Sequence, residues 1–121
     1  MRTAAIMTAF VAFTAVTGAQ AEDKGRMDEL GACLAFSYIA NGLDGRKDVP
    51  EELLPGILAL KDEFMFEASI NGLDDNAAHT LVVEHLAEQN RVRELKGMAS
   101  VRERYLPLCS RVAEGLASGR K

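Results

Sequence analysis

Two cysteines are the residues whose type and placement point most directly to chemistry. Cys33 lies early in the chain and Cys109 late, and neither belongs to a C-x-x-C motif or adjoins a histidine. Without such an activating neighbour, a catalytic thiol is disfavoured. If a chain this small is exported to an oxidising compartment, an even number of cysteines favours a disulfide, and the loop-entropy model gives about 4 kcal/mol of stabilisation for this one. Two free buried thiols and an intermolecular bridge are the alternatives left open.

The two histidines are the next candidates for chemistry. His79 and His85 are separated by about 240° of helical rotation, so they cannot easily share one metal ion. The chain lacks a Glu-x-x-His pair, a C-x-x-C-H motif and a calcium-binding loop, and we expect neither a metal site nor a cofactor. His85 shares an apolar helical face, which predicts a core-edge histidine hydrogen-bonded to a neighbour. His79 is expected to be exposed.

Paired carboxylates could serve as an acid and a base. The adjacent pairs are Glu51-Glu52, Asp62-Glu63 and Asp74-Asp75. Neighbouring residues on a helix diverge by about 100°, so none of these pairs converges as a glycosidase acid and base would. The G-x-S-x-G, P-loop and H-E-x-x-H motifs are also missing from the sequence. We therefore expect no enzymatic activity and no catalytic residues.

The composition is that of one small globular domain. The chain has 121 residues, and its net charge of -4 argues against a general nucleic-acid binder. The charge is uneven, because residues 22–88 hold 15 acids and 5 bases, whereas residues 89–121 hold 3 acids and 8 bases. We interpret this as internal complementarity, with Arg104 and Arg111 facing acids of the first two helices. A basic patch for an anionic envelope partner is the alternative.

Residues 1–21 have the pattern of a signal peptide. Arg2 is followed by an uncharged run, and Ala19 and Ala21 form the small-x-small motif that signal peptidase requires. We expect cleavage before Glu22 and a periplasmic or secreted protein with no stable membrane anchor after cleavage. A membrane anchor or a buried N-terminal helix is the alternative, but a run rich in Ala and Thr would hold poorly in lipid.

The remainder, residues 22–121, is expected to form a single all-α domain, because no convincing strand pattern is present. Apolar spacing and cap signals predict helices over residues 24–41, 55–71 and 74 or 75 to 96, and a fourth from Ser100 onward. Short links between such helices are typical of an antiparallel bundle of three to four main helices, here clamped by the disulfide.

The core-facing side of each helix follows from its apolar residues. The segment 30–43 carries no charge, which indicates that the first helix is the central one. The stripes of the later helices are, in chain order, Ile57, Leu60, Phe64 and Ala68; Ala78, Val82, His85, Gln89 and Val92; and Val101, Tyr105, Leu108 and Val112.

Glycines and caps set the expected helix ends. Asn-Gly at 41–42 and at 71–72 ends the first two helices, and Gly97 ends the third. Ser100 and Glu103 have the spacing of a capping box for the fourth helix, in which Pro107 is expected to produce a kink or a split. The sequence Asn-Gly-Leu-Asp occurs twice, and we favour a repeated cap over a duplicated hairpin.

The segment CLAFSYIANGLD at residues 33–44 resembles the first helix of the Rap/Tai immunity proteins, and the late LPLC at residues 106–109 fits the same pattern. Those small exported helical proteins neutralise cell-wall amidase toxins of type VI secretion systems. The chain departs from the pattern by lacking extra inner cysteines, and residues 49–70 do not align with it. The resemblance implies a toxin-binding, often dimeric bundle without catalytic activity, in which Cys33 and Cys109 carry over as the structural bridge.

In that family a loop can block the toxin's cleft, which suggests a contact surface in the loop after the first helix. Its candidate residues are Asp44, Arg46, Lys47 and Asp48. A plain connector is an equal alternative for this loop.

The function that we expect is protein binding in the periplasm, with an envelope-acting toxin as the candidate partner and a homodimer as an open alternative. A small-ligand or metal-binding bundle of the envelope, or a structural envelope protein, are the other hypotheses.

Overall fold

The computed structural model describes residues 25–43 and 48–119, and this part of the chain contains four helices and no strand. The described part of the first helix covers residues 25–40. It is followed by α2 (Leu54–Ile70), α3 (Asp75–Lys96) and α4 (Met98–Gly119). The expected all-α bundle with a clamping disulfide is therefore confirmed. The expected leader and its cleavage residues Ala19, Ala21 and Glu22 lie outside the described residues.

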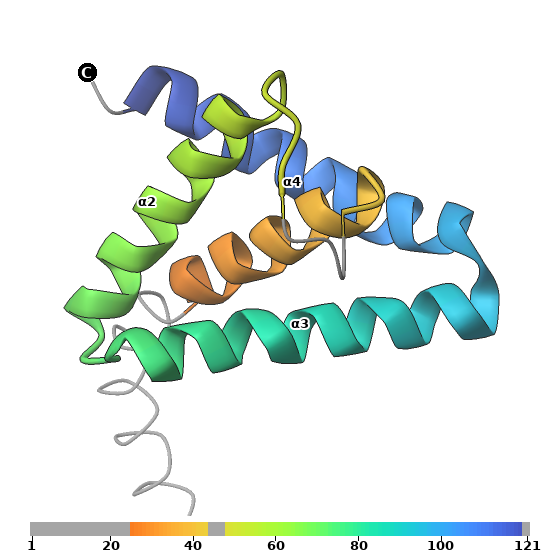
Figure 1. Ribbon diagram of the computed structural model, residues 1–121, viewed down its shortest axis with the longest axis horizontal. Helices are drawn as coiled ribbons and strands as arrows, with labels where there is room; N and C mark the ends of the chain where they lie inside the picture. The colour runs from red at the N-terminus through yellow and green to blue at the C-terminus, as the bar shows by residue number, and fades with distance from the viewer. Residues whose placement is uncertain (1–24, 44–47, 120–121) are drawn as a thin grey trace, which may run out of the picture.

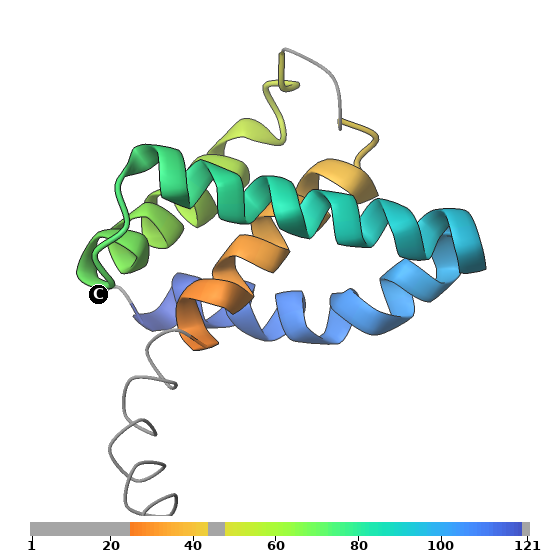
Figure 2. The ribbon, with the colours of Figure 1, turned by 90° about the horizontal axis from the view of Figure 1, so that it is seen from below.

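The first helix is the centre of the bundle. Figures 1 and 2 show α3 and α4 running in opposite directions, with the first helix between them and α2 along one side. Residues 30–36 are buried without interruption. This confirms that the uncharged segment forms a helix covered on most of its circumference.

The first helix and α2 end in the same way. The amide of Leu43 donates to the carbonyl of Tyr38, and the amide of Leu73 donates to the carbonyl of Ala68. The preceding glycines at 42 and 72 have φ of +67° and +82°, a region that only glycine enters without strain. These are Schellman motifs, as the two Asn-Gly pairs predict.

The boundaries of α3 agree with the sequence prediction, but the predicted start of α4 does not. Asp74 caps α3 by accepting from the amide of Ala77 at 2.8 Å, and Gly97 ends it with a φ of +92°. The capping box predicted at Ser100 is wrong, because the chain turns at Gly97 directly into a helix from Met98. The Ser100 hydroxyl instead donates to the carbonyl of Lys96 at 3.3 Å.

α4 continues through Pro107, so the structure excludes the predicted split. Proline cannot donate to the carbonyl four residues earlier, which here belongs to Glu103. Both residues are exposed, so water can hydrogen-bond to the freed carbonyl. An exposed helix can therefore accommodate this proline without breaking.

Two groups of buried side chains form the core. The larger joins the first helix, α2 and the start of α3, and includes Leu30, Phe64 and Val82. The smaller joins the first helix to α3 and α4, and includes Phe36 stacked on Tyr105 with ring centroids 6.1 Å apart. The disulfide between Cys33 and Cys109, predicted from the sequence, ties the first helix to α4 beside this smaller group.

No helix in the described part of the chain is both long enough and apolar enough to cross a bilayer.

Candidate functional site

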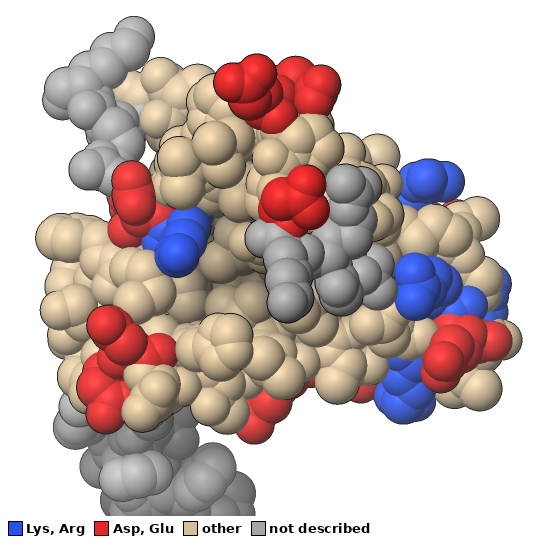
Figure 3. Space-filling model, viewed as in Figure 1, with Lys and Arg blue, Asp and Glu red and all other residues tan. Residues whose placement is uncertain are grey.

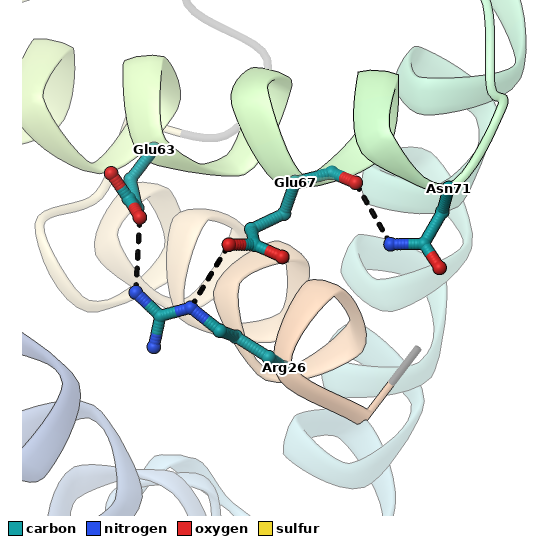
Figure 4. A network of polar contacts seen from close by, with 4 residues as sticks. All are labelled: Arg26, Glu63, Glu67 and Asn71. Carbon is teal, nitrogen blue, oxygen red and sulfur yellow. Dashed lines mark hydrogen bonds and ion pairs between the residues drawn. The ribbon is translucent and has the colours of Figure 1, made fainter. Parts of the chain in front are cut away.

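An ion-pair network links α2 to the first helix (Figure 4). Arg26 donates through Nη2 to Glu63 at 3.0 Å and through Nε to Glu67 at 3.2 Å. The hydrogen bond to Glu63 is the largest cause that raises the pKa of the Arg26 guanidinium above its ordinary value. Glu63 is itself buried, so these contacts hold one side of α2 against the first helix.

The residues of α2 that face the core are those that the sequence predicts. Ile57, Phe64 and Ala68 are buried, and Leu60 is packed against them. The ring of Phe64 lies so close to the first helix that a Cβ added at Gly31 would sit 3.1 Å from its Cε1 atom. Close packing on this side leaves the opposite side of α2 towards solvent.

That opposite side is apolar as well. Leu54, Leu58, Phe66 and Ile70 are 37% to 59% exposed. The smaller residues Pro55 and Ala59, which share this side, are also exposed. Together with Asp62 and Ser69, these residues are called here the outer face of α2. An outward surface of this kind is unusual, because the exposed side of a helix is normally polar.

The outer face is not among the surfaces predicted from the sequence. The signal was available, because α2 carries large apolar residues on the side away from Phe64 as well as beside it. Periodicity alone cannot tell a helix buried on all sides from one that presents an apolar face to solvent. The structure distinguishes these cases, because the first helix packs against one side of α2 and leaves the other side exposed.

A second surface feature is a basic groove of about 290 Å³ where α3 turns into α4. Its walls are formed by Arg91, Val92, Leu95, Lys96, Ser100, Glu103 and Arg104. Figure 3 shows lysine and arginine side chains gathered at this end of the molecule in that view.

The cations of this groove are partly neutralised within the chain. Arg91 donates to both carboxylate oxygens of Glu88, at 3.1 and 2.8 Å. Arg104 lies 4.0 Å from the same carboxylate and over the ring of Tyr105. The hydrogen bond from Arg91 is the main cause that lowers the pKa of Glu88. Arg104 therefore contacts an acid of α3, rather than the acids of the first two helices as expected; it is Arg26 that pairs with acids of α2.

The histidines lie where the sequence predicts. The Nε2 atom of His85 is 2.8 Å from the Oδ1 atom of Asp28, so this core-edge residue links α3 to the first helix. His79 is exposed. Within residues 25–43 and 48–119, no group of three His, Cys, Asp or Glu side chains is arranged to hold a metal ion.

Of the predicted contact loop, the structure describes only the last position. Asp48 is exposed. Asp44, Arg46 and Lys47 lie outside the described residues, so the loop stays a prediction.

Comparison with known proteins adds no family assignment. No protein-family model, curated protein or solved structure matches the chain. The resemblance to the Rap/Tai immunity proteins therefore rests on the residues quoted for it, and function has to be argued from the surfaces described above.

Proposed function

We propose that the chain is an exported protein without catalytic activity that acts by binding another protein, and that the outer face of α2 is its docking surface. One observation carries this proposal. Seven large hydrophobic side chains are exposed in the described part of the chain, and four of them (Leu54, Leu58, Phe66 and Ile70) are spread along the outward half of α2. Single exposed hydrophobic residues are normal, whereas a contiguous patch is typical of an interaction site.

The shape and composition of the face favour a protein as its occupant. The apolar side chains extend along a helix of 17 residues, whereas small molecules are usually bound in concave pockets. A long apolar helical face is suited to pack against a helix of a partner. Burying each half-exposed large side chain would contribute about 1 kcal/mol, and Phe66 is of the aromatic class that often dominates interface energies.

Neutralisation of an envelope-acting toxin is the specific form of this function that the family resemblance supports. The outer face lies within residues 49–70, the segment in which the sequence departs from the family pattern. A docking surface that determines partner choice would be expected to differ in this way. The basic groove supports a small-ligand function less well, because its walls are largely charged and its cations are partly paired.

The proposal also states that the chain is exported. It is supported by the pattern of residues 1–21 and by the disulfide, which persists in oxidising compartments. Protein recovered from the cell envelope is expected to begin at Glu22, and intact-mass measurement checks this. Recovery of a chain that begins at Met1, with free thiols, would contradict export.

Replacing Phe66 and Ile70 together by serine is expected to abolish partner binding with little change in the free energy of unfolding. Both side chains are more than half exposed, so few packing contacts are lost within the monomer. The measurement is photo-cross-linking in living cells from a reactive residue at Ala59, with products identified by mass spectrometry. One defined protein should be cross-linked to the parent chain and lost from the double variant.

The matched controls replace exposed hydrophobic residues on the other helices. Val83→Ser in α3 and Leu106→Ser in α4 remove side chains that are 45% and 51% exposed, and cross-linking should persist in both. The docking surface would be refuted if no defined protein were cross-linked from Ala59, or if the Phe66 and Ile70 variant retained the product.

A further inference from the structure

One carboxylate interrupts the apolar row that the docking surface presents. Positions four residues apart along α2 form a row that reads Leu54, Leu58, Asp62, Phe66 and Ile70. All five side chains are exposed, and Asp62 is the only polar one among them. Asp62 therefore occupies the middle of the row, with two large hydrophobic residues on either side.

The neighbours of Asp62 on the helix provide no positive charge. The residues three and four positions away are Leu58, Ala59, Met65 and Phe66. The only base of α2, Lys61, is adjacent in sequence and so diverges from Asp62 by about 100°. The other two carboxylates of the helix, Glu63 and Glu67, lie on the side that pairs with Arg26.

Docking of an apolar surface on this row would also remove Asp62 from water. A carboxylate that loses its hydration without gaining a partner opposes binding strongly, whereas a hydrogen-bonded cation restores much of the loss. A partner that lacked such a cation would leave Asp62 without a counterpart on α2, since the row and its helical neighbours contain none.

We infer that the partner presents an apolar helix with one lysine or arginine in the middle of its contact face, and that this cation binds Asp62. The inference rests on the proposed docking surface and adds the chemistry of its partner. Asp62 then determines specificity, because an otherwise matching apolar surface without the cation would bury an unpaired carboxylate. A second copy of the chain docked through the same row is disfavoured for the same reason, because that row supplies only another aspartate.

The probe for this inference is a displayed library of amphipathic helical peptides in which the central position of the apolar face is randomised. Selection against the purified, disulfide-bonded protein is expected to enrich lysine or arginine at that position. For a selected peptide, Asp62→Asn should weaken binding at least about tenfold. Asp62→Lys should restore binding to a peptide with glutamate in place of the cation. Glu84→Gln, at an exposed acid of α3, is the control and should change affinity less than about twofold.

The outcomes separate this inference from the proposed function. One outcome would overturn the inference and leave the docking surface in place. In it, the selected peptides lack a central base and bind Asp62→Asn as tightly as the parent protein, but they do not bind the variant in which Phe66 and Ile70 are replaced by serine. Selected peptides that bind this double variant as tightly as the parent protein, or a selection that enriches no peptide, would overturn both the inference and the docking surface. Self-association of the protein that the double variant abolishes would assign the face to a second copy and overturn the inference.

Discussion

Replacing Cys33 and Cys109 together by alanine is expected to lower the free energy of unfolding by about 4 kcal/mol. The disulfide closes a loop of 76 residue positions, and a bridge across a long loop removes more conformational freedom from the unfolded chain than one across a short loop. Domains of this size have total stabilities of about 5–15 kcal/mol. The bridge therefore accounts for a large share of the stability of the fold.

The position of the bridge in the structure explains why other contacts cannot replace it. It joins the first helix to α4 beside the smaller core group, in which Phe36 stacks on Tyr105. Beyond Cys109, α4 contributes only Val112 and Leu116 as partly buried large side chains among its described residues. Without the bridge, the second half of α4 is expected to lose protection from hydrogen exchange first.

Urea unfolding of the double variant and of the oxidised parent measures the loss in stability. The parent chain treated with a thiol reductant is the matched control, because it loses the same bond without a change of side chain. Both samples should show nearly equal losses. A double variant within about 1 kcal/mol of the oxidised parent would mean that the closed loop constrains the unfolded ensemble much less than its length suggests.

Local signals in the sequence predict most of the fold. The Asn-Gly pairs at 41–42 and 71–72 specify the ends of two helices, because glycine alone adopts positive φ without strain and the next residue is a leucine that can fold back. The spacing of Ala78, Val82, Gln89 and Val92 gives the buried face of α3 correctly. These features depend on residues close together in sequence, and short-range physics determines them.

The predicted start of α4 is wrong because two local signals lie close together and the stronger one determines the helix start. Ser100 and Glu103 have capping-box spacing, but the chain turns at Gly97, where φ is positive, and α4 begins at Met98.

Arg104 was expected to face acids of the first two helices, yet its contact is with Glu88 of α3. Which charge lies opposite which depends on the rotation and offset of whole helices, and helical periodicity does not give these quantities.

The docking surface proposed here was missed for the same physical reason. Phe64 and Phe66 are two positions apart and chemically identical, yet Phe64 is 1% exposed and Phe66 is 58% exposed. No property of either residue distinguishes the two environments. The difference comes from the first helix, which approaches one side of α2 closely at Gly31 and is held there by Arg26.

Phe64→Ala is accordingly expected to lower the free energy of unfolding by about 3–5 kcal/mol, which is the usual cost of removing a fully buried aromatic ring. The ring fills the space between α2 and the first helix, and Gly31, which it faces, has no side chain of its own to fill the cavity. Phe64→Leu keeps most of the volume and should cost about 1–1.5 kcal/mol. Urea unfolding of the oxidised variants, with the disulfide intact in each, gives these values.

Phe66→Ala is the matched control, because the same atoms are removed two residues away on the same helix. It should change stability by no more than about 0.5 kcal/mol, since most of the ring is already in water. The two variants together measure which side of α2 is the core. Equal losses from both would show that the outer face is covered within the monomer, and the surface proposed for the partner would then not exist in the isolated protein.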